Sequence, residues 1–286
     1  MAVYKRSYRG YSGAVTPAWS RFLVLYRFAR QSLFSSKFQT GFFVLCFFYP
    51  LVCLLGIYAN AHLSIFAFLG RQVGPLLTVN GSFFYVYMTI QTSLAFLLTA
   101  FIGPGLVSPD LANGALTLYL CRPLSRTEYV LGKMSVLVIT LSWITWIPGL
   151  VLYFAQAGVA GGSWLTQNMP MAGGVLLGSF LWIIVLSLLS LALSAWVKWR
   201  MVAGALLLAI FFIGSGFGQA INGVLGTKQG YLLDIASLIA TVEHSLFGDG
   251  APQSLSVLEA CVALLFFSGC CLALLMRRIK PNEVVQ

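Results

Sequence analysis

The sequence predicts an all-α, polytopic membrane protein, and three observations support this fold class. Of the 286 residues, 59% are hydrophobic and only 8% are charged, whereas soluble domains carry roughly 25% charged residues. Several largely apolar stretches, each of about 18 residues or more, follow one another along the chain, and each is long enough to cross a bilayer as a helix. Basic residues gather in the short segments between these stretches.

The placement of the basic residues predicts the orientation. Of 17 Lys and Arg, seven precede residue 38, three lie at 122–133, two at 198–200 and three at 277–280. This is the positive-inside pattern, so we expect a multi-pass protein of the cell inner (cytoplasmic) membrane with both termini cytoplasmic. The net charge of +10 then reflects topology and contact with membrane lipid, and no nucleic-acid partner is expected.

Residues 1–37 are predicted to form a cytosolic tail followed by an interfacial helix. Apolar residues recur there with helical spacing, at Phe22, Leu25, Tyr26, Ala29 and Leu33. Polar residues lie off this stripe, at Arg21, Arg27, Arg30 and Gln31. The pattern predicts an amphipathic N-terminal helix in the inner interface, its arginines near anionic headgroups. Docking against a soluble subunit is the alternative.

Residues 38–281 are predicted to form a six-span transmembrane domain, and 282–286 a cytosolic tail. The spans are expected at about 41–58, 84–106, 134–154, 174–197, 201–221 and 257–276. Pro50 should kink the first span. Because residues 198–200 make a very short turn, the fourth and fifth spans should be antiparallel neighbours.

Three connections are expected on the outer side. Residues 155–172 are expected to form a charge-free loop. The apolar piece 62–69 is too short to span and could form a helix on the outer leaflet. Residues 222–255 contain a helical repeat, which suggests an amphipathic or re-entrant helix pair. Its members are Leu232, Ile235, Leu238, Ile239, Val242 and Leu246.

Polar and small residues inside the spans have two interpretations. The second span contains Thr89, Gln91, Thr92 and Thr99, which need polar partners in hydrocarbon. Hydrogen bonding between helices and lining of a substrate path both satisfy that need. In the fifth span, Gly214 and Gly218 form a small-xxx-small pair that permits close helix packing, including packing across a two-fold axis.

No catalytic, metal or nucleotide site is evident. The sequence has no G-x-x-x-x-G-K-[ST] loop, and both histidines, His62 and His244, fall on the predicted outer side. Glu243, His244 and Asp249 on a solvated loop would be a poor metal site. Carboxylates at mid-membrane, which an ion-coupled carrier would normally place there, are not expected either.

The polar insert at 105–133 is therefore the candidate functional segment. Asp110, Arg122, Arg126, Glu128 and Lys133 are the only charged residues between Arg71 and Lys198. The run 108–110, Ser-Pro-Asp, is typical of a helix start. Pro123 should break that helix, and Ser125 with Glu128 should form a capping box that opens the next one. A plain connecting hairpin is the structural alternative.

The insert resembles a segment of type-2 ATP-binding-cassette (ABC) exporter membrane subunits. The similar residues are Asp110-x-x-Asn113-Gly114-Ala115-Leu116, then Arg122-Pro123-Leu124-Ser125-Arg126-x-Glu128, then Gly132-Lys133. Ala115 stands where Thr is more usual in the family, and Asp110 where Glu is. The six spans, the N-terminal helix and the long connection before the last span agree with this family.

The resemblance implies a permease whose cytosolic insert is a coupling helix that docks a separate, soluble ATPase subunit. ATP and Mg would bind to that subunit, so this chain would bind no cofactor and would not itself be an enzyme. A second permease copy or a paralogue would pair with it, and the second and fifth spans would border the path. The path residues would be Thr89, Gln91, Thr92, Thr99, Ser215, Phe217 and Gln219. Such a path suits lipids, hydrophobic drugs or peptides equally. An ion-coupled secondary carrier and a membrane-embedded enzyme remain the alternatives.

Overall fold

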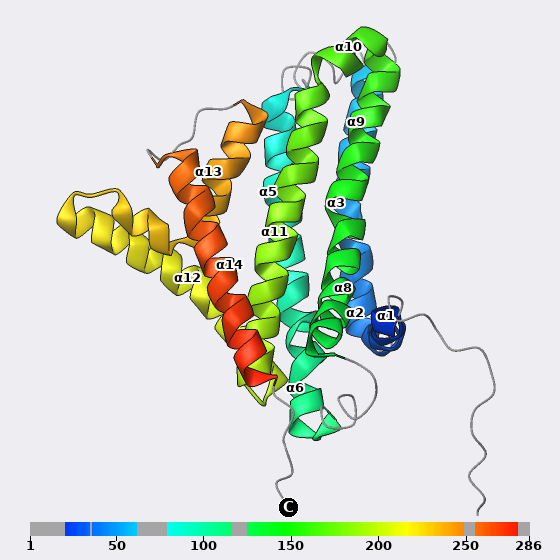
Figure 1. Cartoon of the computed structure of the whole chain (residues 1–286). Coiled ribbons are helices and arrows are strands. Elements are labelled where there is room, and N and C mark those ends of the chain that lie inside the picture. Colours follow the sequence, from blue (N-terminus) through cyan, green and yellow to red (C-terminus); the bar gives the residue numbers. More distant parts are fainter. Residues whose placement is uncertain (1–20, 35, 62–78, 116–124, 249–254, 280–286) are drawn as a thin grey trace, which may run out of the picture.

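In the computed structural model, the described residues are 21–34, 36–61, 79–115, 125–248 and 255–279, and every regular element in these ranges is a helix. Helix α1 (Arg21–Leu33) lies where a helix was predicted. Its Leu25, Tyr26 and Ala29 pack toward the core, and α8 is its neighbour. Figure 1 shows α1 end-on beside the lower ends of α2 and α8, so it runs crosswise to the long helices.

Six helical segments in the described residues are long and apolar enough to cross a membrane, which confirms the predicted number. Three of them consist of two helices each: α2 (Lys37–Leu45) with α3 (Phe48–Ala61), α5 (Gly81–Ile102) with α6 (Pro104–Ala112), and α8 (Arg126–Ile144) with α9 (Trp146–Ala160). The other three are single helices: α11 (Met169–Trp196), α12 (Arg200–Leu225) and α14 (Val257–Arg278). The class of protein is therefore a multi-pass helical membrane protein.

Two of the three divided segments are interrupted three to four residues before a proline. The first breaks at Cys46 and Phe47, not at Pro50, which lies in the first turn of α3. The third, expected to be continuous, breaks at Thr145, three residues before Pro148. The physical reason is the same in both, because proline has no N–H for the carbonyl four residues earlier and its ring crowds that carbonyl.

Helices α5 and α11 form the centre of the bundle. Of the most apolar part of each segment, 72% is buried in α11 and 61% in the α5–α6 segment, against 28% in α12 and 17% in α14. Helix α11 contacts α5, α6, α8, α9, α12, α13 and α14. Figure 1 shows α12 leaning away from the other helices. The peripheral segments are therefore α12, α14 and the α2–α3 segment, which is 22% buried.

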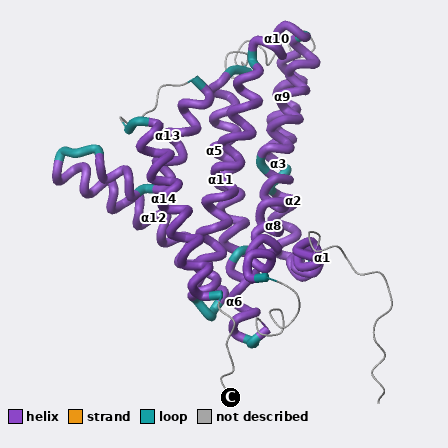
Figure 2. The backbone as a smooth tube through the Cα atoms, in the orientation of Figure 1, coloured by secondary structure: helices purple, strands orange, loops and turns teal. Residues whose placement is uncertain are grey.

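The prediction of a loop at 155–172 is wrong. Helix α9 continues to Ala160, α10 covers Gly162–Gln167, and α11 already begins at Met169. Gly161, with φ of 92°, makes the turn between the first two. Figure 2 accordingly shows α9, α10 and α11 following one another almost entirely as helix. Lack of charge marked this region as non-cytosolic, but it did not exclude helix.

The connection after α12 folds back among the helices. A 3-10 turn, η3 (Gln229–Leu233), lies along α12, and α13 (Ile235–Phe247) packs against α5, α11 and α14. Ile235, Leu238 and Ile239 of α13 are buried. Figure 1 shows α13 beside α14 in the upper half of the bundle. Helix α13 is therefore internal, whereas residues 223–229 before it are exposed. The predicted outer-leaflet helix at 62–69 lies outside the described residues.

Candidate functional site

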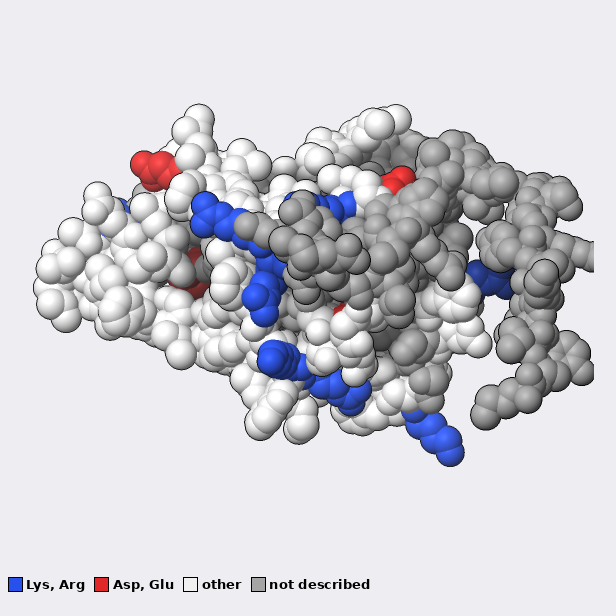
Figure 3. All heavy atoms as spheres, turned by 60° about the horizontal axis from the view of Figure 1, so that its bottom comes forward, with Lys and Arg blue, Asp and Glu red and all other residues white. Residues whose placement is uncertain are grey.

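Several helix ends that carry basic residues lie together on one side of the molecule. We call this side the basic end. It includes Arg126 at the start of α8, Arg200 at the start of α12, and Arg277 and Arg278 in the last turn of α14. Figure 3 looks toward this side and shows Lys and Arg gathered there, with few acidic side chains. The end of α6 and the start of α8, between which the middle of the insert runs, also lie here.

An ion pair joins α6 to α8 at the basic end. Lys133 Nζ lies 2.7 Å from Asp110 Oδ2, with the two side chains 9% and 16% exposed. The Tyr129 hydroxyl donates to the same carboxylate oxygen at 2.8 Å, and the Lys133 ammonium lies 5.6 Å from the centroid of the Tyr129 ring. Two predicted site residues from opposite ends of the insert are thus brought together. Tyr129, which the sequence analysis did not single out, is the third member. We call Asp110, Tyr129 and Lys133 together the acid–base joint.

A serine of α11 ties the same region to the centre of the bundle. Ser194 Oγ accepts hydrogen bonds from the backbone N–H groups of Val107 and Ser108, and donates to the Pro104 carbonyl at 2.8 Å. The Ser108 hydroxyl donates to the Lys198 carbonyl in the turn before α12. A side chain inserted into a helical ladder in this way bends the helix. Helix α6 is therefore fixed to α11 as well as to α8.

The predicted helix start at residues 108–110 is wrong. Helix α6 begins at Pro104, so Pro109 lies inside it and Asp110 lies near its end. The helix already starts at the end of α5, because Gly103 keeps helical dihedral angles and Pro104 takes the first position. The Ser108 side chain does not cap a helix; its hydroxyl bonds elsewhere.

The end of α6 and the start of α8 bound the insert. Asn113 follows the last residue of α6, and Gly114 adopts a left-handed φ of 65°, which ends helices readily because glycine lacks a Cβ. The predicted capping box is confirmed: Glu128 N–H donates to Ser125 Oγ, and Ser125 N–H donates to Glu128 Oε2. Arg126 is exposed and Gly132 is buried. Leu116, Arg122 and Pro123 lie outside the described residues, as does the middle of the insert.

Gln91 acts as a hydrogen-bond bridge at the centre of the bundle. Its side-chain amide donates to the carbonyls of Cys46, at 2.9 Å, and Ile144. These are the two carbonyls that Pro50 and Pro148 deprive of a helical donor, since each proline stands four residues later. The sequence offered Gln91 both as a packing residue and as a path residue; in this chain it is fully buried among α2, α5 and α8.

The other predicted path residues do not share one environment. Thr92 and Thr99 are buried and donate to carbonyls of their own helix, Met88 and Ala95. Thr89 is exposed on α5. On α12, three predicted path residues lie toward the surface: Ser215 is half-buried, and Phe217 and Gln219 are exposed.

Gly214 and Gly218 both pack closely, but against their own chain. A Cβ at Gly218 would lie 2.6 Å from the Gly230 carbonyl oxygen, and one at Gly214 would lie 3.1 Å from that of Leu233. Both carbonyls belong to η3, so the glycine pair of α12 accommodates this 3-10 turn.

Two buried carboxyls in the described part of the chain lie away from the basic end. Asp234, the N-cap of α13, is 2% exposed and accepts hydrogen bonds from the Ala236 N–H and the Ser237 hydroxyl. Glu243, in α13, is 4% exposed, and among the described residues no group hydrogen-bonds to its Oε1. Its side chain lies against Gly178 of α11. Burial raises the pKa of Glu243 to about 7. The expectation that this residue sits on a solvated loop is therefore wrong, because helix periodicity carries it to the face that packs on α11.

The neighbouring histidine does not make this carboxyl a metal site. The His244 ring lies against Tyr85 of α5, with centroids 3.9 Å apart. Asp249 lies outside the described residues. Among the described residues, no group of three or more His, Cys, Asp or Glu is placed to hold a metal ion.

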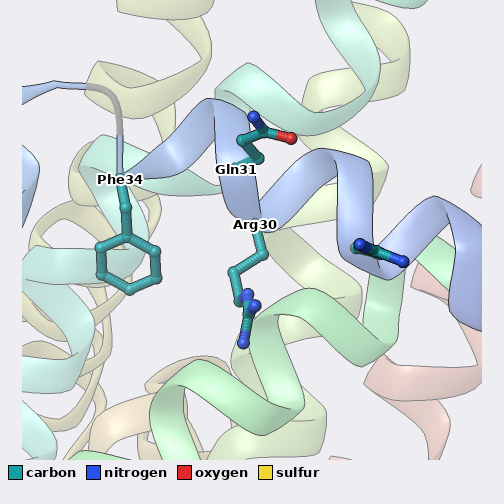
Figure 4. A pocket seen from close by; sticks show the side chains of 4 residues that line it. Arg30, Gln31 and Phe34 are labelled. Atoms are coloured by element: carbon teal, nitrogen blue, oxygen red, sulfur yellow. The ribbon is translucent and has the colours of Figure 1, made fainter.

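A shallow pocket on α1 presents two guanidinium groups. Arg27, Arg30, Gln31 and Phe34 line it, and its volume is about 680 Å³. Figure 4 shows Arg30 and Phe34 extending to one side of the helix and Gln31 to the other. Arg30 also lies 5.8 Å from the centre of the Tyr26 ring. Guanidinium groups one turn apart suit anionic headgroups, the partner predicted for this helix.

Comparison with protein-family models gives no match for this sequence. Comparison with curated proteins gives no relative either. The function is therefore argued from the site.

Proposed function

We propose that this chain is the permease subunit of an ATP-driven exporter and docks a separate ATPase subunit at its basic end. The observation that supports this most is the acid–base joint of Asp110, Tyr129 and Lys133. It holds α6 to α8 on either side of the middle of the insert, so a load on that middle part reaches both helices. The resemblance of the insert to type-2 ABC exporter subunits points the same way.

The contacts at the basic end suggest how the load would spread. Because Asp110 is paired with Lys133 at 2.7 Å, α6 and α8 would move together. Ser194 bonds to α6 from α11, so the central helix would follow. ATP and Mg would bind to the partner subunit, and its closure would rock these helices between inward- and outward-facing states. A second permease would complete the path along α5 and α12.

Co-purification tests the proposal directly. The chain is expressed with a tagged candidate ATPase subunit, and complex formation and substrate-stimulated ATP hydrolysis are measured after reconstitution. Asp110→Asn should uncouple hydrolysis from transport while the complex still forms. The charge exchange Asp110→Lys with Lys133→Asp is the matched control and should restore part of the coupling. If no ATPase binds to the wild-type chain, the proposal fails.

The proposed orientation has its own test. With both termini cytoplasmic, cysteines placed at Arg126, Arg200 and Arg278 should be shielded from an impermeant reagent in intact cells, and one placed at Lys228 should react. A labelled Arg200 position would overturn the orientation.

A proton-coupled carrier is the second candidate, and Glu243 is the observation that favours it. A carboxyl 4% exposed, with a pKa raised to about 7, can take up and release a proton near neutral pH. The sequence counted against this candidate because no carboxylate was expected inside the bundle. Transport driven by a pH gradient without ATP, and abolished by Glu243→Gln, would support it over the exporter.

A further inference from the structure

A groove runs between η3 and α14 on the flank of the molecule, with a volume of about 660 Å³. This lies within the roughly 300–1,000 Å³ typical of sites for small molecules. Its walls come from the turn that follows α12 and from the first half of α14. The residues that matter for the argument are Lys228, Leu232, Leu258, Glu259, Val262 and Phe266.

The groove has a charged end and an apolar length. Lys228 and Glu259 are exposed, and Glu259 lies in the first turn of α14, at the end opposite Arg277 and Arg278. Leu258, Val262 and Phe266 follow at intervals of four residues, so they share one face of the helix. From Glu259 to Phe266 the helix advances about 10 Å. In the orientation proposed above, the groove begins at the outer membrane surface and continues toward the hydrocarbon.

Among the described residues, nothing covers its apolar wall. Leu258 is 72%, Val262 57% and Phe266 74% exposed. A flat helix face would contact bulk lipid without selecting any molecule. A groove bounded by η3 on the other side can instead hold one acyl chain along its length.

The two charges specify the headgroup. Among the described residues, the one ion pair is Asp110 with Lys133, so neither Lys228 nor Glu259 is paired there. Glu259 accepts one hydrogen bond, from the Ser256 N–H at 3.1 Å, and a carboxylate has further acceptor sites. A headgroup with a phosphate and an ammonium matches this cation and anion, and a primary ammonium can donate hydrogen bonds to the carboxylate.

We propose that this groove is a binding site for one phospholipid of the leaflet opposite the basic end, with a zwitterionic phosphoethanolamine headgroup. Lys228 binds the phosphate, Glu259 binds the ammonium, and an acyl chain lies along Leu258, Val262 and Phe266. The site is independent of the proposed export function, since it requires neither an ATPase nor transport.

Native mass spectrometry of the purified full chain tests the site. The protein is freed of lipid in detergent and titrated with dioleoyl phosphatidylethanolamine, phosphatidylcholine or phosphatidylglycerol. We expect one phosphatidylethanolamine to bind, about tenfold tighter than either other lipid. Glu259→Gln keeps an acceptor for the helix cap and removes the charge, and should abolish the preference over phosphatidylglycerol. Lys228→Gln should weaken binding of phosphatidylethanolamine and phosphatidylglycerol alike.

A pair of bulky substitutions separates this site from general lipid contact. Ala263 lines the groove, so Ala263→Trp should fill it and remove the bound lipid. Leu265, also on α14, is 74% exposed and is not part of the groove, so Leu265→Trp should leave binding unchanged. Equal binding by these two variants, or equal affinity for all three lipids, would overturn the proposal. So would a dimer that Ala263→Trp dissociates without loss of lipid, because the groove would then hold a second copy.

Discussion

Two acidic residues that are largely shielded from solvent, Asp110 and Glu243, lie in contrasting environments. Asp110, at the basic end, pairs with Lys133 at 2.7 Å and accepts from Tyr129 at 2.8 Å. Glu243, in α13, packs against Gly178 of α11, and no described group hydrogen-bonds to its Oε1. Asp110 is held by two polar groups, whereas Glu243 has a carboxylate oxygen without a described hydrogen-bond partner.

The different environments of Asp110 and Glu243 suit the basic end and α13 to different tasks. A buried pair with its bonds satisfied fixes two helices relative to each other, and is costly to break because a lone charge would remain. A buried carboxyl without such bonds favours its neutral form, so it responds to pH. The contacts at the basic end therefore hold α6 and α8 in a fixed arrangement, whereas α13 carries a titratable group.

Breaking the pair should have the largest effect. Lys133→Met leaves the Asp110 carboxylate nearly buried without its counter-charge, and should cost about 3–5 kcal/mol of stability. Thermal unfolding of the detergent-solubilised protein measures this. The double variant Asp110→Leu with Lys133→Met removes both charges and should recover most of the loss. If single and double variants unfold alike, the pair is not what holds α6 to α8.

The pH dependence of Glu243 should come next. Its pKa in the folded protein, about 7, exceeds the ordinary value of 4.5, so folding favours the protonated form. The stabilisation is fully present below pH of about 4.5 and should be lost as the pH rises through about 7, roughly 3 kcal/mol in all. Unfolding measured from pH 5 to 8 in wild type and in Glu243→Gln tests this. The variant keeps His244 and Asp234, so a slope that persists in it would assign the effect to them.

Gln91 is a neutral buried group with which the effects of the two acids can be compared. Gln91→Leu would leave the carbonyls of Cys46 and Ile144 without their donor, at about 1–3 kcal/mol for an unsatisfied buried group. Pro50→Ala supplies an N–H to the Cys46 carbonyl. It should therefore reduce the cost of Gln91→Leu in a double-mutant cycle. Simple additivity of the two substitutions would show that Gln91 does not compensate for that proline.

The capping box at the start of α8 shows how much an exposed contact contributes next to the ion pair. Glu128→Ala removes the acceptor for the Ser125 N–H, and should cost about 1 kcal/mol. Glu128→Gln keeps an acceptor and should cost less. Unfolding of both variants checks this, and a loss as large as that of Lys133→Met would mean that the cap, and not the ion pair, anchors this end.

Local pattern determined much of the fold. Six apolar stretches gave the six long helices, because a helix satisfies its backbone within itself and needs only length and composition to be recognised. The Ser125–Glu128 cap was equally local, since both partners lie within one turn. The repeat from Ile235 to Val242 indicated a helix, and in α13 its members are buried. Asp110 and Lys133 were both selected as site residues, but their pairing was not foreseen.

Tertiary structure decided the rest, because it depends on groups far apart in the chain. Nothing local to Gln91 shows that its amide meets carbonyls at Cys46 and Ile144, 45 and 53 residues away. From the sequence Ser108 was expected to cap a helix, but in the structure its N–H donates to Ser194, 86 residues later. Glu243 seemed to belong to a solvated loop because only the packing of α13 against α11 removes it from water. The sequence determines where the apolar spans lie, because their composition is local. The extent of the helices and the pairing of polar groups inside the bundle depend on which helices become neighbours.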